Sequence, residues 1–371
     1  MADSQHVAKS HHTPPTLGSD SVSHQYQAIA WNRQKRVYDL VLAAGVTLYL
    51  TLFVGVSAFL FPYATAKTLI IRAAGSAAFL LLHIVLCIGP LCRLDTKFLP
   101  LLYNRRHLGV VTFLLGAIHS VVAIRQFHSL GDKDPLVSLL TSNQDFGNLP
   151  DFPFQQLGFL ALVILFLMAA TSHDFWLRNL TPPVWKTLHM LVYVAYALLV
   201  AHVTLGLLQS ETSPFFAAGT GIGLFTVITL HVAAARREAK VDWKTLGPAA
   251  EGFVNACALT EIPEKCATVV SLNGERVAIF KYDGKISAIS NVCRHQNGPL
   301  GEGKIIDGCV TCPWHGYQYL PEDGASPPPF TEKVCTFQTR IVDGHVWIDP
   351  RPKPPGTRVE PSLIGTSEVM A

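Results

Sequence analysis

Six stretches of this 371-residue chain are apolar over close to the length at which a helix crosses a lipid bilayer. A membrane-spanning helix needs about 20 apolar residues, because the hydrocarbon core is about 30 Å thick and each residue advances about 1.5 Å. Only 15% of the residues are charged, whereas a typical soluble protein carries about a quarter. The sequence therefore predicts an α-helical membrane bundle of six transmembrane helices, at 40–61, 73–91, 108–127, 154–171, 187–208 and 214–235.

Arginine and lysine gather in alternate connections between these stretches, which the positive-inside rule places on the cytoplasmic side. With six spans both ends of the chain lie in the cytoplasm, and an odd number of spans would reverse that conclusion. The formal net charge of +3 is too small to indicate nucleic-acid binding. The pattern consists of Arg33, Lys35 and Arg36 before the first span, Arg93, Lys97, Arg105 and Arg106 after the second, Arg178 and Lys186 after the fourth, and Arg236, Arg237, Lys240 and Lys244 after the sixth.

The two ends of the chain are polar or rich in proline. Residues 1–35 contain four histidines and lack the apolar run of a signal peptide, so a disordered tail is favoured over a metal-binding tract. Residues 351–371 are predicted to be a second disordered tail, and the basic segment 237–251 a linker between two domains. The four histidines are His6, His11, His12 and His24.

Residues 252–350 have the pattern of a small all-β domain. Short runs of strand-forming residues alternate with Asn-Gly and Asp-Gly pairs. These pairs are strong hairpin-turn signals, because both residues tolerate a positive φ angle. The predicted strands are 267–272, 276–282, 285–291, 337–341 and 346–348, with turns at 273–274, 283–284 and 343–344.

Two short motifs in this domain each pair one cysteine with one histidine: Cys-Arg-His at 293–295 and Cys-Pro-Trp-His at 312–315. Two thiolates and two imidazoles can hold a [2Fe–2S] cluster, with the cysteines on one iron and the histidines on the other. Zinc is the alternative, since Cys₂His₂ also suits Zn²⁺, but zinc-finger spacing groups Cys with Cys and His with His. The predicted metal ligands are Cys293, His295, Cys312 and His315.

The run C-R-H-Q-N-G-P-L-G followed by C-P-W-H-G-Y-Q-Y closely resembles the Rieske family. The resemblance implies an antiparallel β fold with two cluster-binding loops. Rieske proteins of quinol–cytochrome complexes add a disulfide between the loops, but those positions here hold Gly298 and Trp314. Tyr319 matches a family position that hydrogen-bonds near the cluster, while Tyr317 replaces a serine or packs in the core. Fewer hydrogen bonds to sulfur imply a low-potential, ferredoxin-like centre.

Six histidines fall within or beside the apolar stretches, where a polar side chain is costly and usually functional. Neutral imidazole is also a common axial ligand of haem iron. The third and fifth spans run in the same direction, and 12 or 13 residues separate the two histidines of each, about 18–20 Å along a helix. The sequence therefore predicts one or two b-type haems. The histidines are His107 and His119, His189 and His202, and also His83 and His231, for which bonding to a neighbouring helix is favoured.

Residues 70–235 resemble a ferric-reductase-type transmembrane domain, so residues 36–236 are predicted to be a six-helix domain of that family. The matching stretches are R-R-H-L-G at 105–109, running to His119, and W-K-T-L-H at 185–189, running to His202. The resemblance implies His119, His189 and His202 as haem ligands. Family ligands on the third span are usually about fourteen residues apart, which points to Arg105 rather than His107. The fourth ligand is therefore open between His107, His83 and none.

Two further motifs would indicate catalysis, and the sequence has neither. No G-x-G-x-x-G follows a predicted strand, so the chain lacks its own flavin or NAD(P)H site. No two-His-one-carboxylate iron site follows the β domain, where only His345 remains. We therefore predict no catalytic residues and a membrane-bound electron-transfer oxidoreductase. A soluble ferredoxin or flavin reductase would reduce the cluster at its histidine edge, and the haems would pass electrons to an extracytoplasmic acceptor.

Two other functions fit the same residues. In the first, quinol is oxidised at the haem domain and the Rieske centre supplies electrons to a cytoplasmic partner. In the second, the helices bind no haem and anchor a Rieske carrier or sensor. In each case we expect a multi-pass protein in contact with membrane lipid, in a bacterial inner membrane with its Rieske domain in the cytoplasm.

Overall fold

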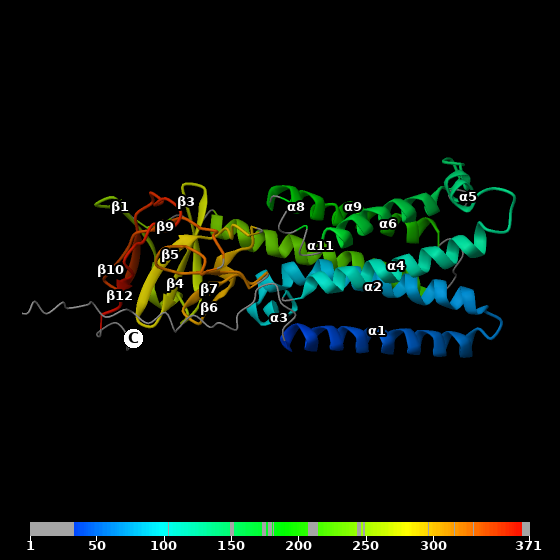
Figure 1. Cartoon of the computed structure of the whole chain (residues 1–371), viewed down its shortest axis with the longest axis horizontal. Coiled ribbons are helices and arrows are strands. Elements are labelled where there is room, and N and C mark those ends of the chain that lie inside the picture. The colour runs from blue at the N-terminus through cyan, green and yellow to red at the C-terminus, as the bar shows by residue number, and fades with distance from the viewer. Residues whose placement is uncertain are drawn as a thin grey trace, which may run out of the picture.

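The computed structural model describes residues 33–102, 104–148, 152–172, 176, 180, 182–206, 214–242, 246–247, 249–295, 297–314, 316–328 and 330–365. Figure 1 shows a bundle of long helices, with a compact β domain packed against one end of it. Residues 1–32 of the predicted tail at 1–35 lie outside the described residues. The same holds for residues 366–371 of the second tail.

Five helical segments are long and apolar enough to cross a membrane, and a sixth apolar helix, α6, is shorter at 17 residues. Seventeen residues extend about 26 Å, a little less than a ~30 Å hydrocarbon core. The multi-span α-helical bundle predicted from the sequence is confirmed. The helices are α1 (Arg33–Leu60), α2 (Ala66–Leu94), α3 (Leu99–Leu102), α4 (Arg105–Phe127), α5 (Pro135–Thr141), α6 (Phe154–Ala170), α8 (Pro182–Met190), α9 (Val192–Leu205) and α11 (Pro214–Asp242).

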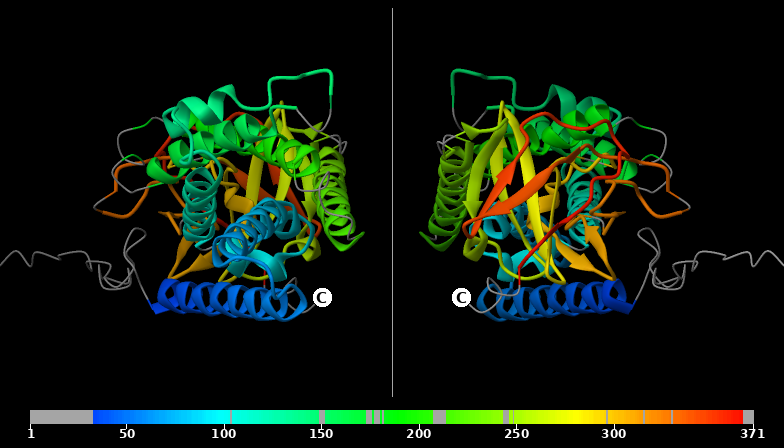
Figure 2. Two further views of the ribbon diagram at one scale, coloured as in Figure 1. Left: turned by 90° about the vertical axis from the view of Figure 1, so that its right-hand side faces the viewer. Right: turned by 90° about the vertical axis from the view of Figure 1, so that its left-hand side faces the viewer.

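Helix α2 lies at the centre of the bundle and packs against α1, α4 and α11. Its small buried residues Ala73, Ala74 and Ala77 let neighbouring backbones approach closely, as is usual between membrane helices. A second close contact joins α6 to α9, where Ala161 and Ala195 are fully buried. Helix α1 lies along the outside of the bundle (Figure 2). Helix α6 also packs against α4, so it links the third predicted span to the fifth.

The fifth predicted span is two helices rather than one. Helix α8 ends at Met190 and α9 begins at Val192, with a turn at Leu191 between them. The final span is longer than predicted, because α11 continues to Asp242, into the first part of the segment 237–251 that was expected to be a linker. That segment begins with good helix formers, and its Glu238 pairs with Arg276 of the β domain.

The β domain contains three antiparallel sheets, with strand orders β1-β2-β11-β10, β12-β5-β4-β3 and β6-β7-β8, and with β9 paired to β5. The predicted hairpin turns are present: Asn273 and Asp283 have φ angles of 50° and 45°. The strands are β1 (Ala249–Ala250), β2 (Phe253–Ala258), β3 (Ala267–Leu272), β4 (Glu275–Tyr282), β5 (Lys285–Ser290), β6 (Lys304–Ile306), β7 (Cys309–Thr311), β8 (Gln318–Tyr319), β9 (Thr336–Phe337), β10 (Thr339–Val342), β11 (His345–Ile348) and β12 (Ser362–Leu363).

The structure differs from the disordered tail expected at 351–371. Over 351–365 the chain runs back along the domain, and β12 pairs with β5. The carbonyl of Thr357 accepts a hydrogen bond from Thr336 Oγ1 at 2.8 Å, and Arg358 lies 2.9 Å from Glu322. Proline has no backbone N–H to donate, but its carbonyl still accepts hydrogen bonds. This Pro-rich stretch can therefore still bond to the sheet and cover its edge.

Candidate redox sites

The two Cys–His motifs form loops with the same backbone hydrogen-bond pattern. In each loop the cysteine N–H donates to the carbonyl five residues on, at 2.9 Å in the first loop and 2.8 Å in the second. The cysteine carbonyl accepts from the N–H four residues on, at 2.7 and 2.8 Å. That fourth residue has a positive φ in both loops: Asn297 at 58° and Gly316 at 72°. The loops are therefore two copies of one turn, which present Cys293 and Cys312 in equivalent ways.

Both thiols are enclosed by the protein. Cys293 is 1% exposed and Cys312 is 2% exposed. Gly298 of the first loop lies against the second, since a Cβ atom there would be 2.7 Å from Cys312 Sγ. Only glycine allows backbone to approach a sulfur atom so closely. Two buried thiols on equivalent turns fit the thiolate pair of a [2Fe–2S] cluster.

One of the two predicted imidazole ligands, His295, stacks on Tyr317 with ring centroids 4.8 Å apart and planes 9° apart. The other, His315, lies outside the described residues. Among the described residues alone, no group of three or more His, Cys, Asp and Glu side chains is positioned around a metal ion. The set of Cys293, His295, Cys312 and His315 therefore stays a prediction, which the paired loops support.

Tyr319 connects the first loop to the β domain. Its hydroxyl accepts a hydrogen bond from the N–H of Arg294 at 3.0 Å and lies 3.3 Å from Cys293 Sγ, to which it can donate. Burial, together with the charge of Cys293, raises the pKa of Tyr319, so this donor stays protonated. The hydroxyl of Tyr317 instead donates to Glu332. Tyr319 therefore reaches the sulfur of Cys293, whereas Tyr317 packs against His295.

In the membrane domain the structure brings His119 and His202 together. Their ring centroids are 6.2 Å apart, with planes 84° apart. Bonds from a metal to imidazole nitrogen are about 2 Å long, and that nitrogen lies roughly 1 Å from its ring centre. Two imidazoles on opposite sides of one iron therefore have centroids roughly 6 Å apart. The observed spacing fits a bis-histidine haem ligand pair.

Each histidine of this pair is held in the same way by a helix behind it. His119 Nδ1 donates to the carbonyl of Ile71 at 2.9 Å, and His202 Nδ1 donates to that of Phe154 at 2.8 Å. A carbonyl accepts only from a protonated Nδ1, so Nε2 keeps the lone pair that a metal needs. Four residues after each carbonyl is a glycine whose added Cβ would lie 2.7 Å from the Nδ1 atom: Gly75 behind His119 and Gly158 behind His202.

His83 and His231 use both ring nitrogens in hydrogen bonds within the bundle. Nε2 of His83 lies 3.0 Å from the hydroxyl of Tyr196, and Nε2 of His231 lies 3.0 Å from that of Tyr193. Their Nδ1 atoms lie 2.7 and 2.8 Å from carbonyls of their own helices. The bonding expected from the sequence explains these two histidines.

His107 and His189 line neighbouring but different cavities. His107 Nδ1 lies 2.9 Å from Asp39 Oδ1 on α1. His189 stacks on Trp185 at 3.8 Å between ring centroids, and its Nε2 lies 3.4 Å from Ser172 Oγ. The two cavities share Ser172 in their linings. The roles of His107 and His189 as haem ligands stay predictions.

Comparison with known proteins agrees with this division into two redox parts. The family model of the ferric reductase like transmembrane component matches residues 74–200, and that of the Rieske [2Fe-2S] domain matches residues 252–338. The chain joins a ferric-reductase-like transmembrane domain to a domain of the Rieske family. The fusion predicted from the sequence is confirmed, and the protein is a membrane protein of electron transfer.

Several curated relatives of the Rieske domain are ferredoxin components. The biphenyl dioxygenase ferredoxin subunit of Pseudomonas sp. (strain KKS102) is 35% identical over 100 residues, covering 26% of this chain and 91% of that protein. The naphthalene 1,2-dioxygenase system ferredoxin component of Pseudomonas aeruginosa is 30% identical over 100 residues, covering 27% and 96%. Among solved structures, the complex of reduced oxygenase and oxidized ferredoxin in carbazole 1,9a-dioxygenase matches 28% of this chain and 99% of that chain, at 20% identity and a TM-score of 0.27.

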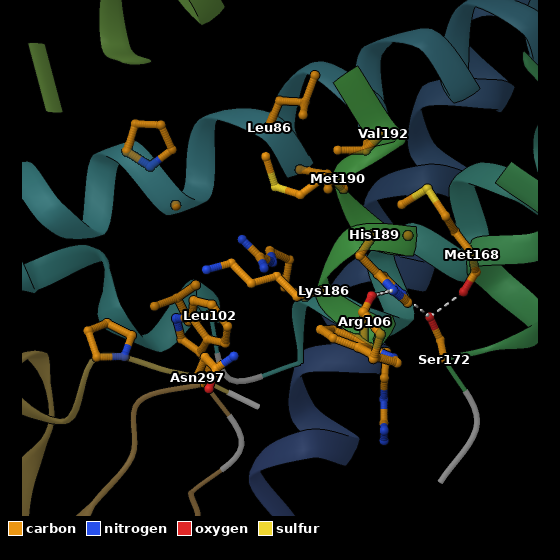
Figure 3. Close-up of a pocket in the computed structure, with 18 of the residues that line it drawn as sticks. Leu86, Leu102, Arg106, Met168, Ser172, Lys186, His189, Met190, Val192 and Asn297 are labelled. Carbon is orange, nitrogen blue, oxygen red and sulfur yellow. Dashed lines mark hydrogen bonds between the residues drawn. The ribbon is translucent and has the colours of Figure 1, made fainter. Parts of the chain in front are cut away.

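A cavity of about 430 Å³ lies where the Rieske domain meets the membrane domain. The Rieske domain contributes His295, Asn297 and Trp314 to its lining, and the membrane domain contributes His189. Figure 3 shows His189, Lys186 and Arg106 around the same space as Asn297. The histidine edge of the first cluster loop therefore faces the membrane domain. The cationic side chains in the lining are Lys35, Arg93, Arg105, Arg106, Lys186 and Arg276.

The sequence did not point to the residues that complete these sites. Gly75 and Gly158 are small residues in apolar helices, a common feature of membrane proteins, and only the histidines opposite them give them a role. Trp314 and Glu302, at the domain boundary, carry no sequence signal of a contact with the membrane domain. The equal spacing of Gly75 from Ile71 and of Gly158 from Phe154 is visible in the sequence only once the pairing is known.

Proposed function

We propose that this protein carries electrons between a Rieske cluster and a b-type haem in the membrane. The cluster ligands are Cys293, His295, Cys312 and His315, and the haem ligands are His119 and His202. The observation that carries the proposal is the 6.2 Å spacing of the two imidazoles in the bundle. The cluster and the haem, when bound, each accept and release one electron, and the protein spaces them and sets their potentials.

The chain's own residues prepare both sites. The carbonyls of Ile71 and Phe154 orient the haem imidazoles and raise their basicity, as outer hydrogen bonds to metal-binding histidines do. The hydroxyl of Tyr319 donates toward Cys293 Sγ and so stabilises electron density on that sulfur in the reduced cluster. Enclosure of both thiols keeps water away from the cluster on the cysteine side.

A second haem is proposed for the cavity side of the bundle, with His189 and His107 as its ligands. His189 precedes His202 by 13 residues, which corresponds to roughly 20 Å along the fifth span. A haem at His189 would therefore lie between the cluster and the His119–His202 site. Both histidines must change partners to share one iron, because Asp39 holds His107 and Ser172 lies beside His189.

We propose outward electron flow, from a soluble ferredoxin or flavin reductase through the cluster to an extracytoplasmic acceptor. The relatives that are ferredoxin components support a cluster that serves as a one-electron carrier. The charge pattern of the loops supports a cytoplasmic Rieske domain, and the membrane we propose is a bacterial inner membrane. Reverse flow from quinol would use the same cofactors, and the order of cluster and haem potentials distinguishes the two directions.

The test is the reduced-minus-oxidised visible spectrum of the purified full-length protein, with haem, iron and sulfide measured per chain. We expect b-type haem beside one cluster, and loss of that haem in His119→Ala and His202→Ala. His231→Ala is the matched control, since its ring bonds only to protein groups. Iron and sulfide without haem would refute the relay and leave a membrane-anchored Rieske carrier or sensor.

A further inference from the structure

The second cluster loop touches the membrane domain through one large side chain, Trp314. Its indole packs against the Rieske core that contains Cys293 and Cys312, and also against the membrane cluster that contains Cys92 and Leu102. Among the described residues it alone belongs to the packing of a core in both domains. Figure 1 shows the strands next to this loop, β6 and β7, beside the end of the bundle at α3.

The same indole also lies against the first cluster loop. A Cβ atom on Gly298 would be 3.2 Å from Trp314 Cγ and 2.7 Å from Cys312 Sγ. Trp314 therefore has the two cluster loops on one side and the membrane domain on the other. It is two residues from Cys312 in sequence, so the indole and the thiol are carried by the same loop.

Two ion pairs cross the same boundary with opposite polarity. In the first pair, Arg93 of the membrane domain lies 3.9 Å from Glu302 of the Rieske domain. In the second, nearby pair, Glu238 of α11 pairs with Arg276 of β4. Because each domain contributes one cation and one anion, turning the Rieske domain around would place like charges together. Such pairs set orientation more than they add affinity.

We propose that Trp314 is the docking residue that seats the cluster against the membrane domain for electron transfer, with the two ion pairs fixing the orientation. This inference rests on the proposed relay. With a cluster held by the Cys–His loops and a haem held by His119 and His202, the seated state would allow one electron to pass from cluster to haem, the cluster being oxidised and the haem iron reduced. No bond forms or breaks, and no proton moves in that step. Trp314 is a positioning residue: it sets where the cluster sits and does not exchange electrons itself.

The test compares Trp314→Ala with Trp347→Ala in the full-length protein. Trp347 is a half-buried tryptophan of the same domain, on β11, beside Arg340 and away from the boundary. The EPR spectrum of the cluster and the haem absorbance first establish that both cofactors are bound. Two readouts follow: the rate at which haem is reduced by the reduced cluster, and amide hydrogen exchange at residues 99–102 and 311–314.

We expect Trp314→Ala to slow haem reduction by roughly tenfold to a hundredfold, the loss typical of a buried interface tryptophan, and to speed exchange at both segments. Trp347→Ala should leave both readouts at the wild-type level. An unchanged rate and unchanged exchange in Trp314→Ala would overturn the docking role while leaving the relay intact. The relay would be overturned if the wild-type protein held both cofactors but passed no electron between them. In that case the hydrogen-exchange comparison would still decide whether Trp314 docks the Rieske domain.

Charge reversal tests the orientation separately. Arg93→Glu and Glu302→Arg should each slow the transfer, and the double variant should restore it, because the pair is re-formed with exchanged signs. The assay is run above the Glu302 pKa of about 7, where its carboxyl group is charged. If the double variant loses as much transfer rate as the two single variants combined, the pair does not fix the docked orientation.

Discussion

Gly158→Ala is the sharpest test of the proposed haem site, because it adds one methyl group behind His202, one of the two proposed ligands. The new Cβ would lie 2.7 Å from His202 Nδ1 and 2.8 Å from Cε1. The ring must therefore move by several tenths of an ångström away from the helix. The hydrogen bond to Phe154, now 2.8 Å long, is strained or lost, at about 1 kcal/mol. Overpacking adds about 1–3 kcal/mol.

Together these costs amount to roughly 2–4 kcal/mol, which corresponds to a loss of haem affinity of about 30-fold to 1,000-fold. Haem that remains bound should have a higher reduction potential, because the imidazole loses basicity with its Nδ1 partner. Haem titration of the apoprotein and a potentiometric titration of the haem absorbance measure the two effects.

The matched control is Gly45→Ala on α1, where an added Cβ meets nothing within 4 Å. That variant should bind haem normally and should be as stable as the wild type or more so, since alanine is the better helix former. Gly75→Ala should repeat the Gly158→Ala result through His119. Wild-type haem affinity and potential in Gly158→Ala would refute the assignment of His202 as a ligand held by this helix.

Two further predictions concern the Rieske domain. Tyr319→Phe removes the hydrogen bond to Cys293 and should lower the cluster potential by about 40–60 mV, for a change near 1 kcal/mol in a one-electron couple. Redox titration followed by EPR measures this, with Tyr282→Phe as the control. Glu302→Gln should remove a pH dependence of docking. Burial, together with the negative charge of Glu238, raises the pKa of Glu302 from 4.5 to about 7, although the positive charges of Arg93, Arg276 and Arg237 oppose the rise. The protonated form is therefore favoured at the boundary. Docking should be strongest below about pH 4.5 and weaken as the pH rises to about 7, by at most about 3 kcal/mol. Protection factors at 99–102, taken relative to the intrinsic exchange rate at each pH, that do not change over this range in the wild type would contradict the role of Glu302.

The parts of the fold that depend on local composition could be predicted from the sequence. The apolar stretches gave the membrane helices because hydrophobicity over 20 residues is a property of the segment alone. The turn at Asn273 was predictable for the same reason, since a positive φ is a local preference. The extension of α11 and the path of 351–365 were not, because each depends on a distant partner: Arg276 for Glu238, and β5 for β12.

The candidate sites divide in the same way. The cysteine–histidine motifs and the depth of His119 and His202 follow from spacing along the chain. Which histidines meet is a question of helix packing, and the structure pairs His119 with His202 while it leaves His107 with Asp39. The contact of Trp314 with the membrane domain could not be predicted. The local sequence around a tryptophan beside a cluster does not distinguish a free ferredoxin from a domain that is docked on a membrane bundle.

The hydrogen bond from His202 to Phe154 has a mechanical consequence. Phe154 is the first residue of α6. Gln156, in the same helical turn, donates to the carbonyl of Ser142 at 2.6 Å and so ties this turn to the segment that precedes α6. Figure 1 shows this end of the bundle, at α5, on the side away from the Rieske domain. A molecule that pushes on that surface displaces the first turn of α6 and changes the length of the bond to the imidazole. The surface that the proposed electron acceptor would touch is thus one hydrogen bond away from His202, the proposed haem ligand.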